Sequence, residues 1–122
     1  VENTIPPNCL VLNIANSNEI NKYINSSEKL ISRAGYSSIM DYLSLRVLDI
    51  ILIPTNGQFE QEYLAGMMQD KFDVPFIHES SLSDKAIHNL IERKSSENKQ
   101  SRKASYYKKI ITQLMELKDF KK

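Results

Sequence analysis

Residues 49–62 read DIILIPTNGQFEQE, and this stretch decides the fold. After Asp49 the run is apolar and largely β-branched, and Pro54 stops it. A short continuous apolar run of this kind is typical of a parallel strand that is buried on both faces. An amphipathic helix is predicted directly after it, over residues 59–69. A buried strand that leads into such a helix indicates an α/β fold.

The same alternation of strand and helix extends in both directions along the chain. Four strands are predicted, at residues 9–14, 29–32, 49–53 and 72–77. Helices are predicted over residues 17–24, 37–45, 59–69, 84–91 and 106–120. The serines expected to cap them are Ser17, Ser37 or Ser38, and Ser83. The pattern predicts an open, parallel, Rossmann-like sheet of about four strands flanked by helices, with an extra C-terminal helix.

Length and composition fit one soluble domain. The chain has 122 residues, of which 41% are hydrophobic and 25% are charged, and this length leaves no room for a second ordinary domain. No apolar run approaches the ~18 residues of a membrane span, and the N-terminus lacks the features of a signal peptide. Cys9 is the one cysteine. It is interpreted as a small core residue, and its isolation favours a reducing compartment.

Charge is unevenly distributed, although the formal net charge is +1. Residues 1–94 carry twelve acidic and eight basic side chains, whereas residues 95–122 carry three acidic and eight basic ones. Basic tails bind nucleic acid or an acidic membrane surface in some proteins. A solvated helix face is favoured here, nucleic acid is not predicted as a partner, and peripheral contact with a membrane stays an alternative.

The last helix is predicted to have one apolar face. Its members, at helical spacing, are Tyr107, Ile110, Ile111 and Leu114. A polar linker is predicted over residues 95–104, ahead of the basic helix of residues 105–122. The apolar face is therefore expected to meet a partner outside the chain, and an exposed face of this kind favours self-association.

A first candidate site lies in residues 31–41, which read ISRAGYSSIMD. Backbone N–H groups at a helix start, together with the positive end of the helix dipole, suit a phosphate group. Gly35 permits close approach of the backbone, Ser37 and Ser38 add hydroxyls, and Asp41 offers a carboxylate that can accept two ribose hydroxyls. Taken alone, an ordinary strand–helix turn with a serine cap explains the same residues more simply.

A second candidate site follows the strongest strand, in residues 53–62. Its polar side chains are those of Asn56, Gln58, Glu60 and Gln61. Ligands of open α/β sheets bind outside the carboxyl ends of the strands, and a carboxylate beside a carboxamide can hold adjacent sugar hydroxyls. A polar loop before a capped helix is the simpler explanation of this segment alone. Both segments should reach the same sheet edge, which strengthens the joint interpretation.

Other candidate sites are weaker. His78 and His88 are too far apart in sequence, and too unsupported, to predict a metal site. Arg33 can meet a phosphate, but a surface role explains it equally well. There is no locally supported Ser-His-Asp pattern and no phosphate-binding loop that ends in Gly-Lys-Ser/Thr.

At these two segments the chain resembles the family-28-like glycosyltransferases, which include the bacterial peptidoglycan GlcNAc transferase. The resemblance covers about residues 8–93 and is strongest in "ISRAGYSSIMD" and "ILIPTNGQFEQEYLA", which look like an uncharacterised bacterial subgroup. It implies a GT-B fold, in which two Rossmann-like domains enclose the active site and the C-terminal domain holds the nucleotide-sugar donor. Residues 1–94 would then be a partial C-terminal donor-binding domain of a cytoplasmic enzyme, with the inner face of the membrane as an alternative location.

The resemblance implies a role for each candidate residue. Gly35, Ser37 and Ser38 would contact the donor diphosphate, and Asp41 would hold the ribose. The donor sugar would be contacted by Gln58, Glu60 and Gln61. The donor would be a UDP-hexose or UDP-GlcNAc, with no metal and no cofactor. Transfer to an acceptor hydroxyl would need an N-terminal acceptor domain or partner subunit, so the catalytic residues are unknown and the chain alone is expected to be inactive.

Some residues depart from the pattern of the family. Ala34 stands where a serine is frequent, Asn56 where a proline is common, and Arg46-Val47-Leu48 replaces a Gly-Lys-Pro turn. The length is also short for such an enzyme, and the resemblance implies that the acceptor domain and the first strand–helix unit of the donor domain are missing from the chain. Three alternatives therefore stay open, namely the small subunit of a split glycosyltransferase, a fragment of a nucleotide-sugar 2-epimerase, and a non-catalytic interaction module.

Overall fold

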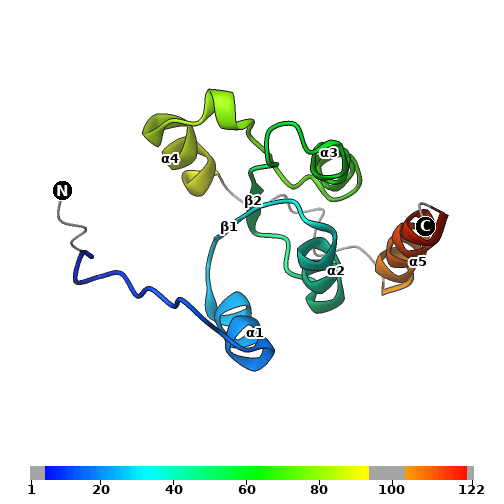
Figure 1. Cartoon of the computed structure of the whole chain (residues 1–122), viewed down its shortest axis with the longest axis horizontal. Coiled ribbons are helices and arrows are strands. Elements are labelled where there is room, and N and C mark those ends of the chain that lie inside the picture. The colour runs from blue at the N-terminus through cyan, green and yellow to red at the C-terminus, as the bar shows by residue number, and fades with distance from the viewer. Residues whose placement is uncertain (1–4, 94–103, 121–122) are drawn as a thin grey trace.

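The computed structural model describes residues 5–93 and 104–120 and is an α/β structure (Figure 1). Its elements in chain order are α1 (Ser17–Ser26), β1 (Leu30–Ser32), α2 (Tyr36–Leu45), β2 (Ile50–Leu52), α3 (Phe59–Phe72), the short 3₁₀ helix η1 (Glu79–Ser81), α4 (Asp84–Glu92) and α5 (Ala104–Phe120). The predicted α/β class is confirmed, and none of the described helices is long and apolar enough to cross a membrane.

The sheet is parallel and small. β1 pairs with β2 in a register that places Leu30 opposite Ile50 and Ser32 opposite Leu52. A third segment joins by a single parallel bridge between Leu52 and Phe76. The sheet of the described residues therefore has two strands and one bridged segment, fewer than the four strands predicted.

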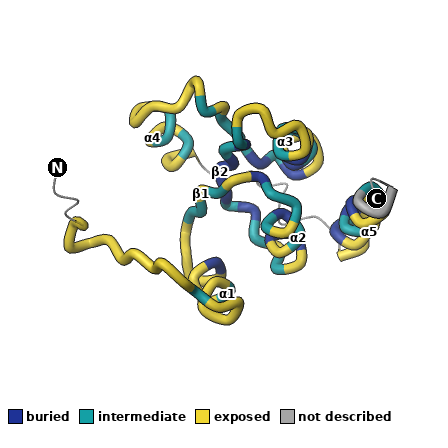
Figure 2. The backbone as a smooth tube through the Cα atoms, in the orientation of Figure 1, coloured by how far each residue is buried: buried dark blue, intermediate teal, exposed yellow. Residues whose placement is uncertain are grey.

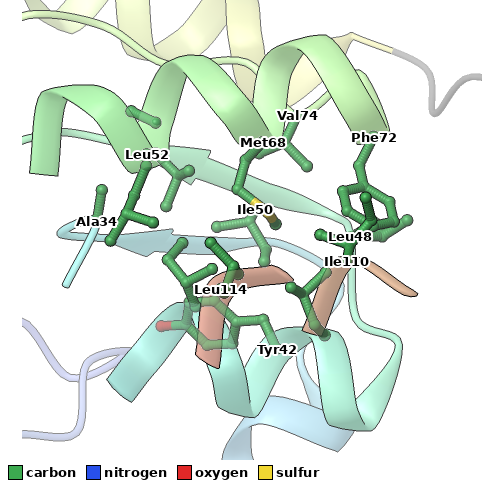
Figure 3. Close-up of a cluster of buried hydrophobic side chains, with 14 of the residues drawn as sticks. Ala34, Tyr42, Leu48, Ile50, Leu52, Met68, Phe72, Val74, Ile110 and Leu114 are labelled. Carbon is green, nitrogen blue, oxygen red and sulfur yellow. The ribbon is translucent and has the colours of Figure 1, made fainter. Parts of the chain in front are cut away.

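The two faces of the sheet are covered differently. Alternate residues of a strand point to opposite faces, and Ile50 and Leu52 lie in the main core with α2, α3 and α5 (Figure 3). The cluster includes Phe72 of α3 and Leu114 of α5. On the opposite face, Ile31 lies near α4, and 52% of its surface is exposed. One face is therefore sealed and the other is partly open.

The prediction of a strand over residues 9–14 is wrong. The segment forms an arm outside the sheet, without strand structure (Figures 1 and 2). Its apolar side chains are exposed, with Leu10 at 69% and Ile14 at 92%, and Cys9 is exposed as well rather than a core residue. An apolar run has strand propensity, but a strand forms only where its backbone finds a neighbouring edge. Among the described residues no strand pairs with this arm.

The predicted strand over residues 72–77 is reduced to the bridge at Phe76. α3 continues to Phe72, which is fully buried, and Asp73 ends the helix in the left-handed conformation, with φ of 59°. Leu52 donates its N–H to the carbonyl of Pro75 at 3.0 Å, while proline itself has no N–H to extend the ladder. Core packing of Phe72 thus lengthens the helix at the expense of the strand.

Two of the three expected helix caps differ from the structure. α1 is capped by Asn16, whose Oδ1 accepts the N–H of Glu19 at 2.9 Å, and not by Ser17. Neither Ser37 nor Ser38 caps α2, because the helix begins one residue earlier and Gly35 occupies the N-cap position. The prediction for Ser83 is confirmed, since its Oγ accepts the N–H of Ala86 at 3.1 Å.

The apolar face of α5 packs on the chain's own core. Tyr107, Ile110 and Leu114 are buried, and α5 contacts α2. The ring of Tyr107 lies 5.3 Å from that of Phe72, and Arg46 stacks over it at 5.4 Å. The expectation that this face waits for an outside partner is therefore wrong, because intramolecular packing already covers it. Ala104 opens α5, and the rest of the predicted linker lies outside the described residues.

Candidate functional site at the carboxyl edge of the sheet

The two candidate segments leave the sheet side by side. β1 and β2 are parallel, and the N–H of Ile53 donates to the carbonyl of Ser32 at 2.8 Å, directly past the last paired residues. The loop after β1 (residues 33–35) and the loop after β2 (residues 53–58) therefore begin at the same edge. This juxtaposition is the one expected of a ligand crevice in an open α/β sheet.

The first loop is short and presents an open helix start. The N–H of Ile39 makes a helical bond to the carbonyl of Gly35 at 3.0 Å, so the N–H groups of Ser37 and Ser38 have no acceptor within α2. A Cβ atom on Gly35 would meet nothing within 4 Å. The surface beside Gly35 is therefore open, and its backbone conformation, with φ of −69°, does not itself require glycine.

Asp41 lies farther along the same helix. Its side chain is exposed, whereas Ile39, Tyr42 and Leu43 are turned into the core. Six residues separate it from Gly35, which corresponds to about 9 Å along a helix axis. Gly35 therefore lies at the start of α2, and the exposed carboxylate of Asp41 lies in the second turn of the same helix.

The second loop contains a tight turn. The N–H of Gln58 donates to the carbonyl of Thr55 at 3.1 Å, and Gly57 at the third position has φ of 81°. A turn with positive φ at that position favours glycine. Gln58 then caps α3 through its backbone only, so its side chain is not used as a cap. The turn sets where the polar start of α3 lies.

The three residues assigned to the donor sugar differ in their surroundings. Gln58 and Glu60 are exposed. Gln61 is half-buried, and its Oε1 accepts the N–H of Thr55 at 2.8 Å. The side-chain carbonyl of Gln61 therefore holds the loop after β2, while the NH₂ group of the same side chain can still donate hydrogen bonds to a ligand.

The departures from the family pattern also find structural explanations. Ala34 is fully buried next to Gly35, so an apolar side chain suits the position. Arg46 ends α2 in the left-handed conformation, with φ of 56°, and its guanidinium stacks on α5. Asn56 is exposed in the turn of the second loop.

Arg33 joins three loops at this edge. Its Nη1 donates to the carbonyl of Ile53 at 3.2 Å and also bonds the carboxylate of Glu79 in η1. The loop after Phe76 (residues 77–83) is thereby tied to the loops after β1 and β2. Sequence reasoning missed Glu79 completely, because 46 residues separate the partners and no local pattern links them.

A cleft lies on the partly open face of the sheet. It has a volume of about 600 Å³ and lies between the sheet and α4. Its apolar lining includes Ile31, Ile53, Leu82, Ile87 and Ile91. Ser83, Asp84 and His88 add polar groups, but none of the candidate site residues lines this cleft. The cleft therefore shares Ile53, Leu82 and Ser83 with the loops of the carboxyl edge, but it does not include the candidate site residues.

The histidines have partners other than a metal. His78 makes an edge contact with the ring of Phe76 at 5.3 Å, and Nε2 of His88 lies 3.1 Å from the carboxylate of Glu92. No group of three potential metal ligands occurs among the residues that the structure describes.

The fold and the edge together define an α/β domain with parallel strands and a polar, open carboxyl edge. A family model described as the glycosyltransferase family 28 C-terminal domain matches residues 11–122. The chain therefore belongs to this family, and the general class of activity is that of a glycosyltransferase. No curated protein and no solved structure matches the chain.

Proposed function

We propose that this chain binds the diphosphate and ribose of a nucleotide-sugar donor at the carboxyl edge of its sheet. UDP and UDP-GlcNAc are the probes best suited to test this binding. The observation that carries the proposal is the common edge of the two loops, joined by the bond from Ile53 to Ser32. Membership of the family supports a nucleotide-sugar as the ligand and an acceptor-binding domain as the partner.

In the proposed complex the diphosphate lies at the start of α2. Gly35 allows the backbone to approach, and the N–H groups of Ser37 and Ser38 point toward developing negative charge on the leaving group. Asp41 accepts the ribose hydroxyls, and Gln58, Glu60 and Gln61 face the sugar. No metal or cofactor is part of the proposal.

The acceptor and the catalytic base belong to another domain or subunit in this proposal. The described chain offers polar groups for one substrate along one edge, and we assign none of them to the acceptor. Sugar transfer accordingly needs both parts, and the chain alone contributes donor binding without turnover.

Substitution of Asp41 tests the proposal. Asp41→Ala is expected to weaken binding of the preferred nucleotide by ~1–3 kcal/mol, because a charged hydrogen bond to the ribose is lost. A thermal-shift titration with UDP, UDP-GlcNAc, GDP and TDP measures the loss of affinity. A ligand that binds only the native state raises the apparent stability of the protein.

The control is Asp70→Ala, which removes an exposed carboxylate of α3 that lies near Lys71. This control should leave nucleotide binding unchanged. Equal affinity of Asp41→Ala and the unaltered chain would remove Asp41 from the site. Absence of any nucleotide-dependent shift in the unaltered chain would argue against donor binding and favour an interaction module.

A further inference from the structure

Positive charge is scarce at the carboxyl edge. The loops that follow the two strands and the bridged segment are residues 33–35, 53–58 and 77–83. Arg33 is the one lysine or arginine in these described loops. Carboxylates are more numerous, with Glu79 in the third loop, Asp41 on α2 and Glu60 at the start of α3. A diphosphate at this edge therefore depends on Arg33 for neutralisation by a side chain.

In the structure, the guanidinium of Arg33 is engaged by Glu79. Both side chains are accessible, with 54% of Arg33 and 33% of Glu79 exposed. A guanidinium presents the same fork of N–H donors to a carboxylate and to a phosphate. Glu79 thus occupies the position at Arg33 that an anionic ligand would take.

We propose that Arg33 binds the donor diphosphate and that Glu79 is a built-in competitor, which the diphosphate displaces. This inference rests on the proposed function, because it takes the same ligand at the same edge. It adds a diphosphate ligand outside the helix start and a carboxylate of the chain itself that competes for that ligand.

The exchange is within reach of the side chain. Arg33 lies two residues from Gly35, and two residues of extended backbone span at most about 7 Å. Rotation about the bonds of the arginine side chain is then enough to carry its guanidinium from η1 to the start of α2. The guanidinium gives up its bond to the carbonyl of Ile53, 3.2 Å away in the structure, in the same movement.

The relative strengths favour the diphosphate. An exposed ion pair between two side chains shifts an equilibrium by only a few-fold, so Glu79 is easily displaced. A diphosphate carries more charge than one carboxylate and offers several acceptor oxygens to the fork. Glu79 therefore lowers the affinity of the site without blocking it.

Isothermal titration of the whole chain with inorganic pyrophosphate and with UDP tests the inference. Glu79→Gln is expected to bind both probes about two- to five-fold more tightly, because the competitor has lost its charge. Arg33→Gln should bind them at least about ten-fold more weakly, and Arg33→Lys should fall between, since lysine keeps the charge without the fork. Higher salt should reduce these differences.

Asp73→Asn is the matched control. Asp73 also pairs with an arginine, Arg93, at 3.5 Å and with similar exposure, but on another part of the chain. Asparagine tolerates the left-handed conformation of that position. The control should bind pyrophosphate like the unaltered chain, which separates competition at Arg33 from a general change in net charge.

Four results would each overturn the inference. Unchanged or weaker binding by Glu79→Gln would show that Glu79 only supports the loop, and unchanged binding by Arg33→Gln would remove Arg33 from the site. Absence of pyrophosphate binding by all variants would count against it equally. Nucleotide binding that depends on Asp41 but not on Glu79 or Arg33 would sink this inference while the proposed function stands. Far-UV circular dichroism of each variant confirms that it is folded.

Discussion

The polar residues at the carboxyl edge are of two kinds. Some hold the loops in place through hydrogen bonds within the chain, and others are exposed and can contact a ligand. The side chain of Gln61 supports the loop after β2, because its Oε1 accepts the N–H of Thr55. The side chains of Gln58 and Glu60 are exposed instead. The side chain of Tyr42 supports the end of β1 in the same way, since its hydroxyl donates to Oγ of Ser32 at 2.7 Å. The resemblance to the family grouped Gln61 with the exposed pair, because all three stand where the family contacts the donor sugar.

Truncation of Gln61 should therefore cost stability. Gln61→Ala leaves the half-buried N–H of Thr55 without its acceptor, and we expect a loss of ~1–2 kcal/mol in the free energy of unfolding. Urea denaturation measures the change. Gln61→Glu keeps an acceptor and should retain most of the stability, and Gln58→Ala is the exposed control. A loss for Gln61→Ala no larger than that for Gln58→Ala would contradict the structural role.

At the scale of elements, the sequence predicted those that local patterns determine. β2 and α3 follow from a β-branched run and a helical stripe, and both are present. The arm of residues 9–14 has an equally apolar pattern, yet it is exposed. Strand formation depends on a neighbouring edge, which a local pattern does not encode. The packing of α5 on α2 is likewise a long-range contact, and the periodicity of the helix wrongly indicated an outside partner.

The packing of α5 makes a direct prediction. Leu114→Ala should destabilise the chain by ~2–4 kcal/mol, because it leaves a cavity in the main core beside α2. Met115→Ala is the control on the same helix, since 53% of Met115 is exposed. Thermal or urea unfolding of the two variants gives the comparison. Equal, small losses would mean that α5 does not share the core and would restore an outside partner for its apolar face.

Across the whole molecule, polar groups from three loops converge on one edge while the main core seals one face of the sheet (Figure 3). The sequence predicted the convergence of the first two loops, because parallel strands must end at one edge. It did not predict Glu79, whose pairing with Arg33 depends on how the segment after Phe76 folds back beside β2. The cleft beside α4 was equally hidden, because it forms between Ile31 and a helix far along the chain.

The central claim, that a donor nucleotide binds at the carboxyl edge, is tested most directly by a ¹H–¹⁵N NMR titration of the chain with UDP. The account predicts progressive shifts of the backbone signals of Gly35, Ser37, Ser38 and Asp41, and smaller shifts near Gln58. Signals of α4, such as Ile87 and Ile91, should stay in place. Shifts confined to the cleft beside α4, or no shifts at saturating UDP, GDP and TDP, would contradict the account.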